Sequence, residues 1–256
     1  MDEALRRADE AANRALELDK TVAEAHTVKA GIYLNRKQHS EAGEAFRKAI
    51  ELKPSYAVAH LRYGYFLMWG LRIDDALAHM RRAQQLDPAS PITNAALGSM
   101  LMTARNMDES IKYSQRALDL EPNMVGARLN LAGAYLEKGR FDDALREIEK
   151  TPNTHGEYVL TEKAYAYAVA GRHDEALRIF SSLQKLVGPR GRPYIYARFY
   201  GALGDKDKAF EWLEKIYINH VTIAWLKYDS QLDTLRGDQR FKDFLTRHKL
   251  DYLLQS

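Results

Sequence analysis

The sequence predicts an all-α fold built from repeated helical hairpins, and three observations lead to that prediction. Of the 256 residues, 46% are hydrophobic and 29% are charged, and the 7 prolines and 15 glycines leave long stretches of helix-favouring residues. The segments AIELKP, AQQLDP and ALDLEP end at Pro54, Pro88 and Pro122, each 34 residues after the one before. Small residues recur at two fixed positions of this period, as helices in close contact require.

The repeat extends in both directions from these anchors. A fourth copy, ALELDK at residues 15–20, lies one period earlier, with Lys20 in place of the proline. Residues 1–20 match only the second helix of a repeat, and residues 223–256 follow the last repeat as a C-terminal cap. We therefore predict a single array over 1–256, with repeats at about 23–56, 57–90, 91–124, 125–156, 157–189 and 190–222.

Two columns of small residues indicate how the helices of a repeat pair. The size of the side chains at a contact sets the distance between two helix axes. A single hairpin cannot bury its apolar stripe, so each hairpin must cover its neighbour, and stability becomes a sum over adjacent contacts. The eighth position of the repeats holds Ala30, Gly64, Gly98, Ala132, Ala164 and Ala197, and the twentieth holds Ala42, Ala76, Ser110, Ala144, Ala176 and Ala209.

This pattern resembles the tetratricopeptide repeat (TPR), and the resemblance spans about residues 1–222. It implies a right-handed α-α superhelix of about six helical hairpins, in which the first helix of each hairpin lines a concave groove. The copies depart from the family pattern at position 4, where the usual tryptophan is replaced, for example by His60. The turn glycine at position 15 is kept only as Gly139, Gly171 and Gly204.

The two ends of the array call for different explanations. The missing partner of the 1–20 helix indicates either a fragment of a larger protein or a natural single-helix cap. At the other end, residues between Trp225 and Phe241 resemble the closing part of TPR regions in bacterial multidomain signalling proteins, namely winged-helix regulators, nucleotide cyclases and Ser/Thr kinases. Ser230 and Gln239 replace two prolines that are usual there.

The cap and the last repeat also carry local signals. Pro193 is expected to delay the start of the first helix of the last repeat. Asp238 is a good N-cap for a helix that begins at Gln239. Four apolar side chains of the cap are predicted to cover the end of the last repeat: Leu235, Phe241, Phe244 and Leu245.

The sequence offers no pattern for catalysis, metals or cofactors. The chain has no cysteine, its histidines occur singly, and it contains neither a phosphate-binding glycine loop nor a nucleophile elbow. Acidic pairs such as Asp74 and Asp75 begin predicted helices, where they complement the helix dipole. The net charge of +3 is spread along the chain, and the apolar runs are too short to span a bilayer. We therefore expect no enzyme, no cofactor, no metal site, no nucleic-acid binding by this region and no membrane insertion.

A partner is expected in the groove that the TPR resemblance implies. The inward-facing positions of that family include an aromatic and thioether stretch on repeats two to four, which favours a partly apolar peptide. The alternative is that some of these side chains pack against neighbouring helices. The lysine/asparagine/arginine clamp of some TPR proteins is largely missing. The candidate groove residues are Arg62, Tyr65, Met68, Trp69, Met102, Asn130, Glu162, Tyr165 and Arg198, and the same face includes Tyr158, Thr161 and Tyr194.

These features predict a non-catalytic module that binds a protein or peptide. We expect it to be the sensing or scaffolding part of a bacterial signalling or transcription-regulatory protein. The alternatives are a stand-alone assembly scaffold, or a fragment of a cyclase or kinase whose catalytic domain lies upstream. We expect a cytoplasmic location, with the periplasmic face of a membrane-anchored regulator as the alternative. Self-association into a homodimer through the terminal helices is a further expectation.

Overall fold

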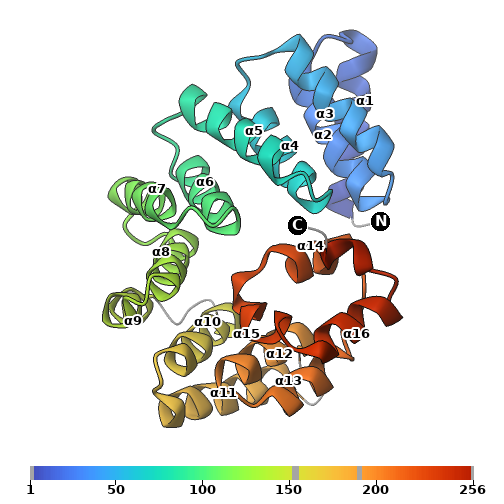
Figure 1. Ribbon diagram of the computed structural model, residues 1–256. Helices are drawn as coiled ribbons and strands as arrows, with labels where there is room; N and C mark the ends of the chain where they lie inside the picture. Colours follow the sequence, from blue (N-terminus) through green and yellow to red (C-terminus); the bar gives the residue numbers. More distant parts are fainter. Residues whose placement is uncertain (1–2, 152–155, 189–191, 255–256) are drawn as a thin grey trace. The chain divides into compact units, whose positions relative to one another are not determined.

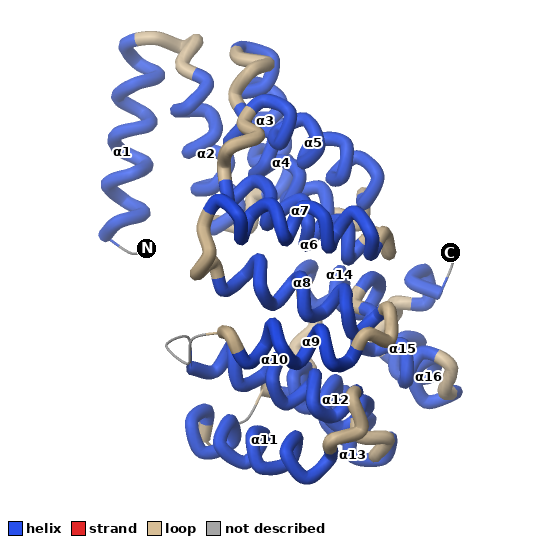
Figure 2. The backbone as a smooth tube through the Cα atoms, turned by 90° about the vertical axis from the view of Figure 1, so that its left-hand side faces the viewer, coloured by secondary structure: helices blue, strands red, loops and turns tan. Residues whose placement is uncertain are grey.

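Sixteen α-helices and no β-strand make up the part of the chain that the structure, a computed structural model, describes: residues 3–151, 156–188 and 192–254 (Figures 1 and 2). The predicted all-α class is confirmed. The predicted limits at residues 1, 189, 190 and 256 lie outside the described residues. The chain forms two compact units, Met1–Leu97 and Gly98–Ser256.

Six helical hairpins follow an N-terminal helix and precede a group of short C-terminal helices, as predicted. The boundary between the two units falls inside α6. The helices are α1 (Glu3–Leu18), α2 (Ala23–Asn35), α3 (His39–Leu52), α4 (Ala57–Trp69), α5 (Ile73–Leu86), α6 (Pro91–Thr103), α7 (Met107–Leu120), α8 (Val125–Glu137), α9 (Phe141–Glu149), α10 (Gly156–Val169), α11 (His173–Val187), α12 (Pro193–Ala202), α13 (Lys206–Leu213), α14 (His220–Tyr228), α15 (Asp233–Arg236) and α16 (Gln239–Arg247), with 3₁₀ turns at Ser230–Leu232 and Asp251–Leu254.

All twelve residues of the two small columns are buried, which confirms their predicted role between paired helices. A Cβ added at Gly64 on α4 would lie 2.7 Å from Cγ of Met80 on α5. A Cβ added at Gly98 on α6 would lie 2.5 Å from Oγ of Ser114 on α7. Ser110 uses its hydroxyl group to donate a hydrogen bond of 2.8 Å to the Gly98 carbonyl. Larger residues at the glycine positions would push these helices apart.

The turn inside each hairpin has one residue in the left-handed region of backbone conformation. This residue is always at position 15 of the predicted repeat. In three hairpins it is the expected glycine, with φ between 69° and 82° (Gly139, Gly171 and Gly204). In the other three it is Lys37, Leu71 and Arg105, with φ of 60° or 61°. The turn geometry is therefore kept where the glycine is lost, at a cost in backbone strain for residues that carry a Cβ.

Unit Met1–Leu97 begins with α1, which packs against α2. Asp9 on α1 is buried and accepts hydrogen bonds from Lys29 Nζ at 2.6 Å and from an Arg36 Nη at 2.5 Å. The exposed side of α1 carries ion pairs such as Arg14 with Glu17. Its outer surface is therefore largely charged, which provides the polar end that a helical array needs.

Unit Gly98–Ser256 has its main core between α8 and α12. In this core the Phe180 ring on α11 stacks on the Phe199 ring on α12, with centroids 3.9 Å apart. Pro193 is the first residue of α12, which confirms that the helix starts late. Asp238 accepts a hydrogen bond from the Arg240 backbone N–H at 3.1 Å, as expected of the N-cap of α16. The four cap residues Leu235, Phe241, Phe244 and Leu245 are at most 2% exposed, as predicted.

The C-terminal segment of this unit also reaches beyond the last repeat, which the sequence did not indicate. Asp233, at the start of α15, accepts two hydrogen bonds from Arg105, at 2.8 and 2.9 Å. Arg105 lies in the turn between α6 and α7, 128 residues earlier in the chain. The 3₁₀ turn Ser230–Leu232 and α15 both pack against α12. The cap therefore covers part of the inner side of the unit as well as its end.

Candidate functional site

Four of the predicted groove residues lie on α4, in the unit Met1–Leu97. Arg62 is exposed, whereas Tyr65, Met68 and Trp69 are half-buried. The rings of Tyr65 and Trp69, one helical turn apart, have centroids 6.4 Å apart. Burial raises the pKa of the Tyr65 hydroxyl group above its ordinary value. These residues give α4 a face of aromatic and thioether groups.

The other five predicted residues lie in the unit Gly98–Ser256, on four helices. Met102 on α6 packs against α8, where a Cβ added at Gly133 would lie 3.0 Å from its Sδ atom. Asn130 is half-buried on the same helix α8. The structure brings together only the last three: Glu162 and Tyr165 on α10, and Arg198 on α12.

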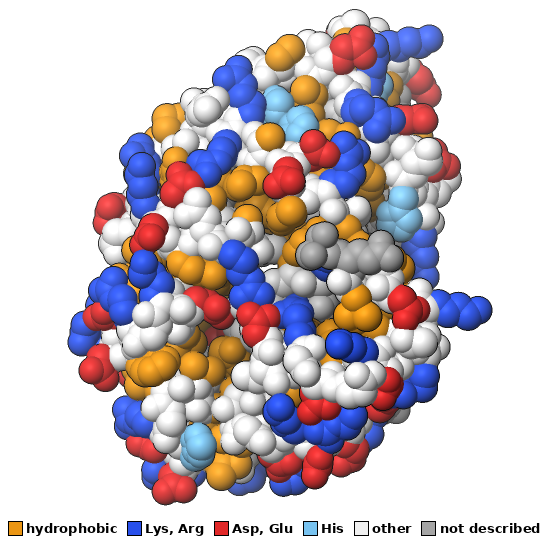
Figure 3. Space-filling view, viewed as in Figure 1, with side chains coloured by type: hydrophobic (Ala, Val, Ile, Leu, Met, Phe, Trp, Pro, Cys, Tyr) orange, Lys and Arg blue, Asp and Glu red, His pale blue; other side chains and the backbone are white. Residues whose placement is uncertain are grey.

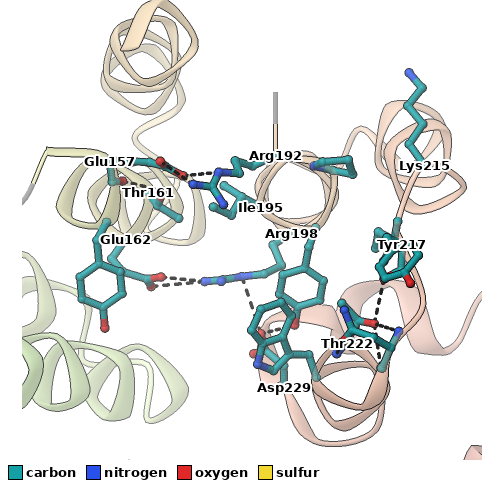
Figure 4. A pocket seen from close by; sticks show the side chains of 16 residues that line it. Glu157, Thr161, Glu162, Arg192, Ile195, Arg198, Lys215, Tyr217, Thr222 and Asp229 are labelled. Carbon is teal, nitrogen blue, oxygen red and sulfur yellow. Dashed lines mark hydrogen bonds and ion pairs between the residues drawn. The ribbon is translucent and has the colours of Figure 1, made fainter. Parts of the chain in front are cut away.

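Arg198 is the centre of a buried polar cluster (Figure 4). Its guanidinium group donates to Glu162 at 3.0 Å, and its Nε atom lies 3.8 Å from a carboxylate oxygen of Asp229. The same group lies 5.5 Å from the ring centre of Tyr165 and 5.6 Å from that of Tyr194. The Tyr194 hydroxyl group donates to Asp229 at 2.5 Å. One cation thus holds two carboxylates and two aromatic rings in place.

The pKa shifts in this cluster keep Arg198 charged and the hydroxyl groups of Tyr165 and Tyr194 protonated at neutral pH. Burial by itself would lower the pKa of Arg198, but Glu162 and Asp229 outweigh it, and the pKa is raised above its usual value. Burial also raises the pKa of the Tyr165 and Tyr194 hydroxyl groups. A group that does not titrate near neutral pH is a poor general acid or base. The contacts of Arg198 therefore fix the positions of the carboxylates and aromatic rings around it.

The C-terminal segment completes the cluster and covers it. Asp229 comes from the end of α14, and the amide of Gln231 donates to Glu162 at 3.3 Å. As a result Tyr165 and Arg198 are each only 9% exposed. Residues that the sequence placed on the groove surface therefore contact the chain itself, and little of their surface is open to a partner.

A cavity of about 760 Å³ opens beside this cluster, within the same unit. It is lined by residues of α10, α12 and α14 and by the 215–217 stretch that follows α13 (Figure 4). Five of the residues that the sequence analysis named on the predicted inner face line it: Tyr158, Thr161, Glu162, Tyr194 and Arg198. The cavity is of the size that protein pockets use to hold small ligands or side chains.

Exposed aromatic rings dominate the open part of this cavity. Tyr158 is 52% exposed, Tyr217 is 77% exposed and Trp225 is 40% exposed. The Trp225 ring also packs on the Tyr194 ring, with centroids 4.7 Å apart. Aromatic residues of this kind carry much of the binding energy in protein interfaces. We refer to Tyr158, Tyr217 and Trp225, with the cavity between them, as the aromatic pocket.

Several polar side chains that line the aromatic pocket have partners inside the chain. The Thr161 hydroxyl group donates to the Glu157 carbonyl at 2.8 Å, and the Thr222 hydroxyl group donates to the Tyr217 carbonyl at 3.0 Å. Arg192 and Glu157 form an ion pair at 2.7 Å. A ligand in the pocket therefore meets mostly apolar surface and need not replace these hydrogen bonds.

The described residues contain no group of three or more His, Asp or Glu side chains that could hold a metal ion. No helix among them is both long and apolar enough to cross a bilayer. On the face drawn in Figure 3, basic and acidic side chains are interspersed with hydrophobic ones.

Family comparison agrees with the hairpin architecture. Tetratricopeptide repeat families match residues 23–56, 101–159 and 158–181. The chain contains tetratricopeptide repeats. No curated protein matches the chain.

Solved TPR structures share this fold at low sequence identity. PilW, a type IV pilus biogenesis factor, has a TM-score of 0.64 and 22% identity, over 84% of this chain and 98% of its own. YrrB, described as a TPR protein with an unusual peptide-binding site, has a TM-score of 0.54 and 20% identity, over 81% and 100%. MamA has a TM-score of 0.54 and 22% identity, over 64% and 91%. At these identities the likeness establishes the fold.

Sequence reasoning missed part of the aromatic pocket. It placed Tyr158 on the inner face, but it assigned Trp225 to the cap and gave Tyr217 no role. Both lie outside the TPR consensus, in the stretch where the last hairpin gives way to the cap. The sequence feature that could have indicated it is the run KIYINHVTIAW (residues 215–225), which contains Tyr217 and Trp225 and is more apolar than is usual for a solvent-exposed loop.

Proposed function

We propose that this chain is a non-catalytic TPR module that binds a protein segment, and that the segment enters the aromatic pocket. The observation that carries the proposal is the grouping of three exposed aromatic side chains around one cavity on the inner side of a TPR unit. Water-exposed aromatic surface of this kind is stabilised when a partner covers it. The internal pairing of the polar groups favours a ligand with apolar side chains.

The second candidate surface is the α4 face with Arg62, Tyr65, Met68 and Trp69. Its aromatic pair supports a role in binding, but three of its four side chains are half-buried. The pocket residue Tyr217, by contrast, is 77% exposed and could lose most of this exposure on binding. We therefore place the main contact in the aromatic pocket.

The broader role that we propose is sensing or scaffolding in a signalling or regulatory protein. The resemblance of the cap segment to the ends of TPR regions in such proteins supports this context. Self-association through α1 is the weaker proposal, because exposed ion pairs such as Arg14 with Glu17 cover its outer side. Ion pairs of this kind favour solvent over a dry helix interface.

A displayed library of random peptides tests the proposal with a defined probe. Peptides selected on the intact protein are measured by fluorescence anisotropy against three proteins: the wild type, Tyr217→Ala/Trp225→Ala and Arg62→Ala/Trp69→Ala. We expect the pocket substitutions to weaken binding at least tenfold, which is about 1.4 kcal/mol. The α4 substitutions should change it little.

Tyr217→Ala alone serves as the control for folding, because this side chain is largely exposed and its loss should not disturb the core. Selected peptides that bind the pocket variant as tightly as the wild type would disprove the assignment. The assignment would also be disproved if the library yielded no peptide that binds the wild type more tightly than it binds the Tyr217→Ala protein.

A further inference from the structure

The charged side chains that line the aromatic pocket balance one another. Arg192 is held by Glu157 at 2.7 Å. The Lys215 ammonium group pairs with Glu211 at 2.7 Å, lies 4.1 Å from the ring centre of Trp212, and points away from the pocket in Figure 4. The pocket therefore suits an uncharged ligand. Its cations and carboxylates are equal in number: Arg192, Arg198 and Lys215 against Glu157, Glu162 and Asp229.

The pocket also holds hydrogen-bond donors that are not used inside the described part of the chain. The Trp225 indole N–H and the Tyr217 hydroxyl group take part in no hydrogen bond there. Asn219 uses its side-chain oxygen to accept from the backbone N–H groups of Val221 and Thr222, at 2.9 and 3.0 Å. The other end of that amide is an NH₂ group, which only donates, as an indole N–H does. The connection between α13 and α14, together with α14, thus presents donors to a ligand.

The acceptors of the pocket, by contrast, are engaged. Each carboxylate in its lining lies against an arginine, and Asp229 also accepts from the Tyr194 hydroxyl group at 2.5 Å. The Thr222 hydroxyl oxygen accepts from the Asn219 backbone N–H at 2.8 Å. A ligand N–H buried in the pocket would find few partners, and an unpaired buried donor costs binding free energy.

A ligand that fits these groups is uncharged and apolar, and it offers acceptors without donors. Proline has these properties, because its backbone has a carbonyl group and no N–H. We propose that the aromatic pocket binds a proline-rich segment in the polyproline II conformation. This inference rests on the proposed function, since it names the class of segment that the same pocket takes.

The conformation matters as much as the residue type. A polyproline II segment has no internal hydrogen bonds, so its carbonyl groups are available to Tyr217, Asn219 and Trp225. The carbonyl groups of a helical segment are used within the helix, and such a ligand would leave these donors unpaired. Proline rings pack on exposed aromatic rings such as those of Tyr158 and Trp225, and the segment loses little entropy because its conformation is formed before binding.

Defined peptides test this preference. A labelled oligoproline peptide with blocked ends is titrated with the intact protein, and fluorescence anisotropy reports binding. Alanine in place of one central proline should weaken binding about two- to fivefold, because it adds an N–H and a more flexible backbone. N-methylalanine, which has no N–H, should recover part of that loss. The affinity for oligoproline should be the same at low and high salt, because neither the peptide nor the pocket lining carries a net charge.

A protein variant assigns the effect to the donors of the pocket. Tyr217→Phe/Asn219→Asp keeps the aromatic ring and the N-cap oxygen but removes two donors, and aspartate caps a helix as well as asparagine does. We expect it to bind oligoproline about threefold more weakly or worse. Tyr252→Phe is the control, because it removes a hydroxyl group from a side chain that is 48% exposed and does not line the pocket. It should bind as the wild type does.

The outcomes separate this inference from the proposed function. The proline preference would be overturned if peptides from the random library bound and oligoproline did not, while Tyr217→Ala/Trp225→Ala could still weaken those peptides. It would also be overturned if alanine in place of proline had no effect, or if Tyr217→Phe/Asn219→Asp bound oligoproline as tightly as the wild type. Library peptides that ignore Tyr217→Ala/Trp225→Ala would instead remove the proposed function itself.

Discussion

At the scale of single residues, position 15 of the repeat keeps a left-handed backbone conformation even where glycine, the residue type that favours it, is replaced. Leu71 has φ of 60° and Gly171 has φ of 74°, in equivalent turns. A left-handed conformation costs about 1–2 kcal/mol for a residue with a Cβ and little for glycine. The surrounding hairpin therefore imposes the turn on Leu71.

Exchanging the two residue types should change stability in opposite directions. We expect Leu71→Gly to raise the free energy of unfolding by about 0.5–1 kcal/mol, because the relief of strain exceeds the added entropy of the unfolded chain. Gly171→Ala should lower it by about 1 kcal/mol. Urea unfolding followed by circular dichroism measures both, and a Leu71→Gly protein less stable than the wild type would contradict the assignment of strain.

His60 on α4 and His79 on α5 form a hydrogen-bonded pair. When both rings are neutral, their contacts allow only one arrangement of the ring protons. Their Nδ1 atoms are 2.9 Å apart, and Nε2 of His60 lies 3.2 Å from the Pro54 carbonyl oxygen. Because a carbonyl only accepts, His60 must carry its hydrogen on Nε2, so its Nδ1 accepts from His79. Protonation of both rings would place two N–H donors opposite each other and break this hydrogen bond.

This pair predicts a pH dependence of stability. Burial lowers the pKa of both His60 and His79 below the ordinary value of 6.5, so the unfolded chain binds protons more readily. The stabilisation is fully present above pH 6.5 and is lost as the pH falls below it toward the lowered pKa values. His60→Leu/His79→Leu should lose less stability between pH 7.5 and pH 5 than the wild type, measured by urea unfolding at each pH. The exposed control His173→Gln should behave as the wild type does, and equal slopes for all three proteins would contradict the prediction.

At the scale of elements, Arg198 ties α12 to α10 and to the end of α14. Its partners Glu162 and Asp229 are largely buried, so a protein without the cation would hold two uncompensated carboxylates. We expect Arg198→Met to cost about 3 kcal/mol in the free energy of unfolding. Adding Glu162→Gln should recover part of that loss.

The exposed pair Arg14 with Glu17 supplies the control for that experiment, since both side chains are more than half exposed. Arg14→Met should leave the unfolding transition where it is. If Arg198→Met were no more harmful than Arg14→Met, the cluster would not organise the pocket as described.

The helices themselves could be predicted from local patterns, whereas the position of the cap could not. The small columns, the N-cap at Asp238 and the start of α12 at Pro193 depend on residues close in sequence, and each was found as expected. The ion pair of Arg105 with Asp233 joins residues 128 positions apart, and no periodicity signals such a contact. For the same reason Arg198 was taken for a groove residue, although the C-terminal segment covers it.

At the scale of the whole molecule, a TPR chain offers inner surface on every repeat, so the place of binding depends on which surface stays open. Glu162, Tyr165 and Arg198 are closed off by the chain's own Asp229 and Gln231, and the aromatic pocket beside them stays open. The TPR pattern predicts which positions face inward. It could not identify the accessible ones, because accessibility depends on the cap, which lies outside the repeat.

The central claim, that a protein segment binds at Trp225 and not at Trp69, can be tested by tryptophan emission. The chain has three tryptophans, so Trp69→Phe/Trp212→Phe leaves only Trp225, and Trp212→Phe/Trp225→Phe leaves only Trp69. Both proteins are titrated with a peptide selected from the random library, and anisotropy reports binding independently. We predict that the Trp225 emission changes in proportion to bound peptide while the Trp69 emission stays constant. Saturable binding that alters Trp69 and leaves Trp225 unchanged would contradict the account.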